Sequence, residues 1–236
     1  MAKQSNRQDK NKVALVLAVI AAVLVIVCIA AFVINNKKDN NRTDITEGQE
    51  QAAGKEDASS DNGGMPAVTS EDYFADIDIK DYGKITVKLD GEAAPITVKN
   101  FVSLAKEGFY DGLTFHRIME GFMMQGGDPE GTGMGGSSKT IVGEFPNNGY
   151  DNRLSHTRGA ISMARSSSYN SASSQFFIVH QDSLGLDGEY AAFGYVTEGI
   201  EVVDAICSDA QPVDGNGFIA AEEQPVINSI TIRSAD

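Results

Sequence analysis

A run of 22 residues without a charged or strongly polar side chain, Val13 to Ile34, constrains the structure of this chain more than any other feature. A helix rises about 1.5 Å per residue, so a helical run of this length crosses the roughly 30 Å hydrocarbon core of a bilayer. Lipid offers the backbone no hydrogen-bond partners, whereas a helix satisfies its own amides. We therefore expect residues 13–34 to form a transmembrane helix, preceded by a short basic segment at residues 1–12.

Two alternatives to a retained anchor remain open. A cleaved signal peptide has a shorter apolar region of about 7–15 residues, followed by a cleavage site with small residues. A lipoprotein signal has a small residue directly before its modified cysteine. The run is too long for the first, and Val27 stands before Cys28. The retained anchor is therefore the preferred interpretation.

The basic residues on the two sides of the run predict its orientation. Four Lys or Arg residues precede the run and three follow it within residues 35–42. Positive residues favour the cytoplasmic side, and the run lies near the start of the sequence. We therefore expect a single-pass protein of the cell membrane whose C-terminal part lies outside the cytoplasm, in the layout of a bacterial membrane-anchored protein.

Residues 35–70 are rich in Asn, Asp, Glu, Gly and Ser and nearly free of large apolar side chains. Such a segment buries too little apolar surface to offset the entropy of ordering it, so it is predicted to be a flexible acidic and polar linker. The formal net charge is −14, but residues 1–42 alone carry +5, which leaves −19 on the rest. This acidic balance gives no electrostatic reason to bind nucleic acid, which we exclude as a partner.

Residues 71–236 have the pattern of a mainly β domain. Apolar and polar residues alternate over 74–80 and 84–89, and Gly83 lies in the short connection, which predicts a β-hairpin. Pro95 suits a first helical turn and Gly108 a helix end, so a helix is expected between them. A second helix is expected over 199–206 and a last strand over 226–232. These elements indicate a barrel or sandwich with two packed helices.

Three blocks of this domain resemble the cyclophilin family. Residues 114–136 read TFHRIMEGFMMQGGDPEGTGMGG and resemble its first signature. Residues 159–164 (GAISMA) with 174–177 (SQFF) resemble the second, and 186–188 (LDG) with 193–194 (FG) provide a third match in family order. The resemblance implies that residues 71–236 form a closed eight-stranded antiparallel β-barrel capped by two helices. It also implies peptidyl-prolyl cis-trans isomerase activity on proline-containing unfolded or extended polypeptides, assisting the folding of exported or membrane proteins.

Rotation about an X–Pro bond crosses a barrier of about 18–20 kcal/mol and takes tens to hundreds of seconds without a catalyst. No bond is broken, so we expect neither a cofactor nor a metal. By the resemblance, the catalytic residues are Arg117, Phe122 and Gln125. Arg117 would donate to the prolyl nitrogen in the twisted state, Phe122 would line the pocket for the proline ring, and Gln125 would position the arginine.

The resemblance further implies a set of substrate-binding residues around these three. At two of these positions the chain departs from the family. Arg165 stands where the family often has asparagine, and Tyr190 stands where a histidine is frequent. The full set is His116, Met123, Ala164, Arg165, Gln175, Phe177, Leu186 and Tyr190.

The sequence fits three other function classes less well. A non-catalytic peptide-binding module would use the same groove, but it would be free to lose Arg117. Residues 131–136 fit a G-x-G-x-x-G nucleotide pattern, but no helix is predicted after them. The serine-rich run 165–174 lacks the spacing of a serine hydrolase. The isomerase therefore remains the leading hypothesis.

Overall fold

The computed structural model describes residues 71–235. The predicted basic segment 1–12, the transmembrane helix 13–34 and the linker 35–70 lie outside the described residues and remain predictions. Within residues 71–235, the helices are too short or too polar to cross a bilayer.

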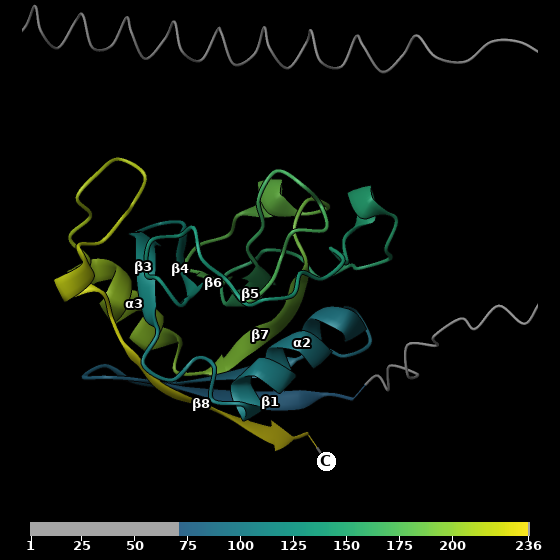
Figure 1. The fold of residues 1–236 in the computed structure, drawn as a ribbon, viewed down its shortest axis with the longest axis horizontal. Helices are drawn as coiled ribbons and strands as arrows, with labels where there is room; N and C mark the ends of the chain where they lie inside the picture. Colours follow the sequence, from purple (N-terminus) through teal and green to yellow (C-terminus); the bar gives the residue numbers. More distant parts are fainter. Residues whose placement is uncertain (1–70, 236) are drawn as a thin grey trace, which may run out of the picture. The chain divides into compact units, whose positions relative to one another are not determined.

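One antiparallel sheet organises the described part of the chain (Figure 1). Its strands follow the order β3-β4-β6-β5-β7-β2-β1-β8. The predicted hairpin is confirmed, because β1 and β2 pair from Tyr73 opposite Leu89 to Ile79 opposite Gly83. The strands are β1 (Tyr73–Ile79), β2 (Gly83–Leu89), β3 (Thr114–Met119), β4 (Met123–Asp128), β5 (Ala160–Met163), β6 (Phe176–Val179), β7 (Ala192–Glu198) and β8 (Ile227–Ser234).

The prediction of a closed barrel is wrong, because the sheet is an open half-barrel with β3 and β8 at its edges. In residues 71–235 the start of β3 and the residue before β8 are joined by one isolated bridge, Thr114 to Val226, and neighbouring backbone hydrogen bonds, but β3 and β8 do not pair as strands. Beyond that point a loop takes the place of β8. Ile118 N donates to Gly217 O at 2.8 Å, and Ile219 N donates to His116 O at 3.0 Å. The outer edge of β3 is thus covered by residues 217–219.

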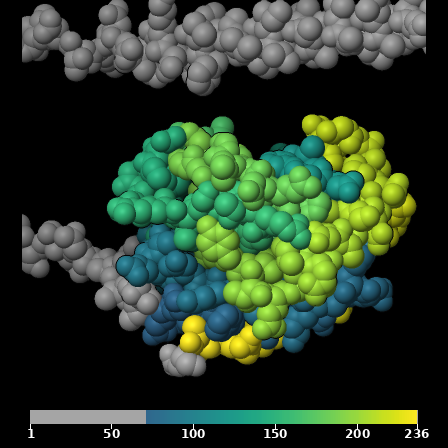
Figure 2. All heavy atoms as spheres, turned by 180° about the vertical axis from the view of Figure 1, so that it is seen from behind, coloured from purple at the N-terminus to yellow at the C-terminus, as the bar shows by residue number. Residues whose placement is uncertain are grey.

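The other edge of the sheet is extended by the last strand. β8 pairs with β1 along nearly its whole length, with a shift in register between Asp78 and Ile79. Figure 2 shows the consequence from behind, where the yellow residues of β8 lie beside the blue residues of the β1–β2 hairpin.

Two helices pack on the sheet, α2 (Pro95–Lys106) and α3 (Ile200–Asp209), and both confirm sequence predictions. Pro95 occupies the first turn of α2 as expected. Gly108 adopts φ 70°, in the left-handed region that favours glycine, so the helix stops where the sequence predicted. Short 3-10 helices lie at Pro146–Asn148, Leu184–Leu186 and Ala221–Glu223.

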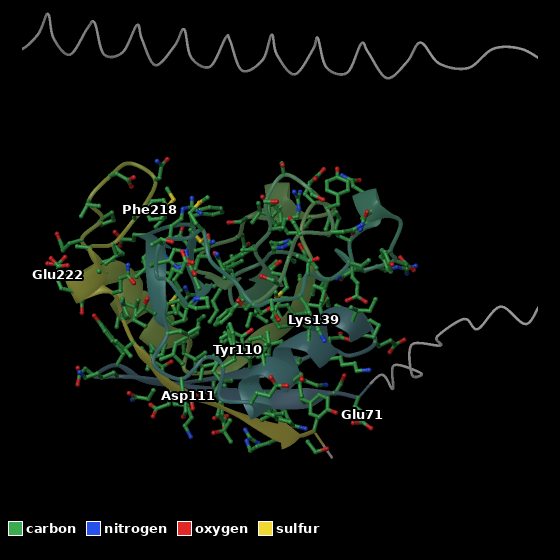
Figure 3. The ribbon with its side chains drawn as sticks, in the orientation of Figure 1. Glu71, Tyr110, Asp111, Lys139, Phe218 and Glu222 are labelled. Carbon is green, nitrogen blue, oxygen red and sulfur yellow. The ribbon has the colours of Figure 1, made fainter. Side chains whose placement is uncertain are left out.

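The core lies between α2 and the inner face of the sheet, where Tyr110 is seen in Figure 3. Its centre is aromatic. The Phe101 ring packs edge-on against the Phe176 ring, with their centroids 5.4 Å apart. The centroids of the Phe101 and Phe193 rings are 5.3 Å apart. Successive residues of a strand point to opposite faces, so Phe176 belongs to this core while Phe177 joins a small cluster on the other face. The sheet therefore separates a core face from a groove face.

Candidate active site

A cavity of about 170 Å³ lies on the groove face. Three neighbouring strands supply a row of side chains across it, since Arg117 of β3 is opposite Gln125 of β4, and Gln125 is opposite Phe177 of β6. Paired residues of adjacent strands share one face. The lining residues are Arg117, Phe122, Met123, Gln125, Ala164, Arg165, Phe177, Leu186 and Tyr190. The cavity thus brings together nine of the eleven predicted site residues.

The guanidinium of Arg117 is held from two sides. Its Nε donates to Asn216 O at 2.7 Å, and its Nη1 donates to Gln125 Oε1 at 3.3 Å. The sulfur atoms of Met119 and Met123 lie 3.2 and 3.9 Å from its Nη atoms and are weak acceptors. A guanidinium has five N–H donors, so the group keeps donor capacity toward the groove.

Burial lowers the pKa of Arg117 from its ordinary value, while the neighbouring Tyr190 and Asp214 act in the opposite direction. An arginine stays protonated at neutral pH despite such a shift. The result is a permanent charge that has lost part of its hydration, and electrostatic interactions are stronger in such an environment.

The cavity wall beside Arg117 is largely apolar. Met123 is 2% exposed and Phe177 is 5% exposed. The ring of Tyr190 meets the ring of Phe177 edge-on, with centroids 5.9 Å apart. Phe122 and Leu186 complete this wall. A small apolar ring fits here, with the charged donor at its edge.

Gln175 does not line this cavity, but it holds Gln125, which does. Gln125 Nε2 donates to Gln175 Oε1 at 2.9 Å. Gln175 Nε2 in turn donates to the carbonyls of Gly133 and Gly135 at 3.1 and 2.7 Å. Gln175 therefore connects the amide beside Arg117 with loop 131–136, and it lines a neighbouring cavity of about 480 Å³ together with that loop.

The side chain of His116 does not lie where a residue that contacts the substrate would lie. The register of β3 against β4 shifts between Phe115 and Arg117, so His116 is an extra residue in the strand and does not follow its alternation. Its side chain is fully buried, lines neither cavity, and lies 6.3 Å from Phe218 between ring centroids. Figure 3 shows Phe218 beside the top of β3. The side chain of His116 therefore offers no direct contact with a ligand in the groove.

Sequence reasoning missed two supports of the site. Asn216 holds Arg117 through a backbone carbonyl from 99 positions away, and no local pattern signals such a contact. His156 bonds Asp187 through Nδ1 at 2.8 Å and Ser162 through Nε2 at 3.0 Å, and its ring stacks on Phe177 at 5.9 Å. The sequence signal for His156 was its position just before the second cyclophilin-like block.

Comparisons with known proteins agree with this geometry. The family model of the cyclophilin type peptidyl-prolyl cis-trans isomerases matches residues 74–236. Peptidyl-prolyl cis-trans isomerase B of Bacillus subtilis is 50% identical over 123 residues, which cover 52% of this chain and 82% of that protein. A peptidyl-prolyl cis-trans isomerase of Helicobacter pylori is 48% identical over 126 residues, covering 52% of this chain and 74% of that protein.

A solved structure shares the fold. The crystal structure of a Cryptosporidium parvum cyclophilin type peptidyl-prolyl cis-trans isomerase, in the presence of the dipeptide Ala-Pro, matches with a TM-score of 0.60 and 32% identity. The match covers 68% of this chain and 99% of that chain. With the family model spanning most of the chain and the arginine-edged cavity in place, the chain belongs to the cyclophilin-type peptidyl-prolyl cis-trans isomerases.

Proposed function

We propose that this isomerase uses Arg117 as its catalytic donor and acts at the outer face of a membrane on proline-containing segments of exported or membrane proteins. The observation that carries the catalytic part is the row of Arg117, Gln125 and Phe177 across three strands, at the edge of an apolar cavity. These residues provide a charged donor, its positioning amide and an apolar surface in one place.

The chemistry follows from the electronic structure of the peptide bond. The X–Pro bond resists rotation because its nitrogen lone pair is delocalised into the carbonyl. In the twisted state the lone pair is localised on the nitrogen, which becomes a hydrogen-bond acceptor. A guanidinium aimed at that nitrogen stabilises the twisted state more than the planar one, which lowers the barrier.

The apolar wall has a separate role. With the proline ring held against Phe177 and Met123, the ring stays fixed while the preceding carbonyl group rotates. Both side chains are almost fully buried in the protein, so the surface they present is preorganised. The Ala-Pro dipeptide present with the Cryptosporidium parvum relative supports proline-containing peptides as the ligand class.

The sequence supports a site of action at a membrane. The apolar run 13–34 is long enough for a membrane anchor, and the polar residues 35–70 provide a tether. Exported chains arrive unfolded, and uncatalysed X–Pro isomerisation takes tens to hundreds of seconds. An isomerase tethered at the membrane would meet these chains before their slow proline steps are complete.

The test is a proline-isomerisation assay on the full chain in detergent micelles, with Arg117→Ala as the variant. We expect the wild type to accelerate isomerisation and the variant to lose about 10²–10³-fold in kcat/KM, as on removal of a preorganised donor in other enzymes. Arg153→Ala is the control, because the side chain of Arg153 is 84% exposed and pairs with Asp151 away from the cavity.

Two results would contradict the proposal. One is an inactive wild type, and the other is an Arg117→Ala variant with unchanged kcat/KM. If Arg117→Ala loses isomerase activity but still assists the folding of exported proteins, the result would instead support a non-catalytic peptide-binding module.

A further inference from the structure

The guanidinium of Arg165 is enclosed by aromatic rings at the rim of the groove. Its Cζ lies 4.6 Å from the ring centroid of Tyr190, 4.9 Å from that of Tyr169 and 5.4 Å from that of Phe145. The side chain is only 11% exposed. The three rings come from three separate loops, so Arg165 joins segments that are distant in the sequence.

All three nitrogens of this guanidinium have acceptors within the protein. Nε donates to Glu189 O at 2.9 Å and Nη2 donates to Glu189 Oε2 at 3.1 Å. Nη1 donates to Ser166 O at 2.9 Å. The charge is therefore paired with the Glu189 carboxylate and stacked on aromatic rings, which leaves it poorly placed to bind a substrate carboxylate.

Arg165 also lies between the two cavities of the groove and lines both. Its stacking partner Tyr190 lines the smaller cavity, and the Tyr190 ring packs edge-on against Phe177. A continuous line of contacts thus runs from Arg165 through Tyr190 to the apolar surface on which we place the proline ring.

We propose that Arg165 is a positioning residue of the proline pocket, which acts by holding Tyr190 against Phe177. Stacking fixes the Tyr190 ring, and the hydrogen bond to Glu189 O fixes the backbone directly before it. The inference rests on the proposed function, because it concerns the same cavity. It assigns the side chain of Arg165 an indirect role, in addition to the pairing of its backbone with the peptide that the family resemblance implied.

The role predicts a particular kinetic pattern. A loosened pocket wall weakens binding of the planar and the twisted proline alike, and loss of uniform binding raises KM without changing kcat. A substitution of Arg165 leaves Arg117 and its acceptors, Asn216 O and Gln125 Oε1, in place. Loss of a desolvated cation–π contact gives an expected rise in KM of about tenfold for Arg165→Asn, with kcat within about twofold of the wild type.

The experiment is NMR exchange spectroscopy on the full chain in detergent micelles, with Ala-Pro and Glu-Pro peptides at increasing concentration. Arg165→Asn is compared with Arg165→Lys, which keeps the charge but not the planar fork. We expect both variants to raise KM for both peptides. Combining Arg165→Asn with Tyr190→Leu should add little to the effect of Tyr190→Leu alone, because the two residues act through one contact.

Arg233→Asn is a matched control. Arg233, on β8, lies over the Phe74 ring at 5.1 Å and bonds Asp76 at 2.9 Å, so it has the same kinds of partner, both on β1. It lines neither cavity. We expect this variant to keep the KM and kcat of the wild type, even where thermal unfolding shows a similar loss of stability.

The outcomes separate the alternatives. A rise in KM confined to the Glu-Pro peptide would make Arg165 a direct charge partner of the substrate and overturn the inference. Unchanged kinetics in Arg165→Asn would overturn it as well. If that variant does not fold, an unchanged KM in Tyr190→Leu overturns it. An inactive wild type refutes the proposed function instead, whereas an active wild type with unaffected Arg165 variants refutes this inference alone.

Discussion

At the scale of single residues, His116 and Arg117 are neighbours in the sequence with opposite environments. Arg117 faces the groove, whereas His116 is fully buried and neither of its ring nitrogens has a hydrogen-bond partner among residues 71–235. Burial lowers the pKa of His116, and the positive charge of Arg117 adds to this, while the Asp128 carboxylate acts in the opposite direction. The folded protein therefore favours the neutral imidazole.

This environment predicts how stability depends on pH. The unfolded chain binds a proton at His116 near pH 6.5, while the folded chain binds it only at lower pH. Between those two pKa values the unfolded state binds more protons, so the free energy of unfolding falls as pH decreases below about 6.5. We expect His116→Leu to reduce this pH dependence, measured by urea unfolding at about pH 7.5 and pH 5.

A second buried histidine affects how the His116→Leu result is interpreted. His156 is also buried and its pKa is also lowered chiefly by burial. The His116→Leu variant should therefore keep part of the dependence on pH. A pH dependence identical to that of the wild type would show that His116 does not titrate differently in the two states.

At the scale of elements, the start of α2 depends on a carboxylate from another part of the chain. The residue before the helix, Ala94, provides no side-chain cap. Glu144, which is 1% exposed, accepts from Ile96 N at 3.0 Å and from Thr97 N and Thr97 Oγ1 at 2.7 Å each. The amides of a first helical turn lack partners within the helix, and a negative charge is favourable there. Glu144 thus joins α2 to the loop after residue 141.

We expect Glu144→Ala to lower the free energy of unfolding by about 1–3 kcal/mol, because it leaves the buried Thr97 amide without an acceptor. Glu144→Gln keeps an acceptor oxygen and should cost less. The measurement is urea unfolding at neutral pH. Glu92→Ala is the control, since Glu92 is exposed just before the same helix and should change stability by less than about 0.5 kcal/mol. Equal losses for Glu144 and Glu92 would refute the capping role.

At the scale of the whole molecule, the predicted orientation can be tested directly. If residues 71–236 lie outside the cytoplasm, protease added to intact cells, or to spheroplasts where an outer membrane is present, should digest them. A cytoplasmic marker protein should stay intact until the cells are lysed. An isomerase domain that survives until lysis would overturn the orientation, which rests on four basic residues before the apolar run against three after it.

The sequence by itself determined the local elements and most of the residues that line the cavity. Alternation around Gly83 predicted the β1–β2 hairpin, and Pro95 and Gly108 predicted the bounds of α2. These signals are short-range, because a strand pairs through a tight turn and a helix ends where one residue adopts a left-handed conformation. The resemblance of three separate blocks to the cyclophilins likewise pointed to nine residues that the fold gathers in one cavity.

Only the tertiary structure decided how distant parts meet. It left the sheet open, because residues 217–219 occupy the β3 edge. It placed Asn216 O on Arg117, Glu144 at the start of α2, and the rings of Phe145 and Tyr190 beside Arg165. Each of these contacts joins segments whose separation in the sequence carries no periodic signal. They form because a buried donor, carboxylate or guanidinium needs a partner, and the packed fold determines which partner is within reach.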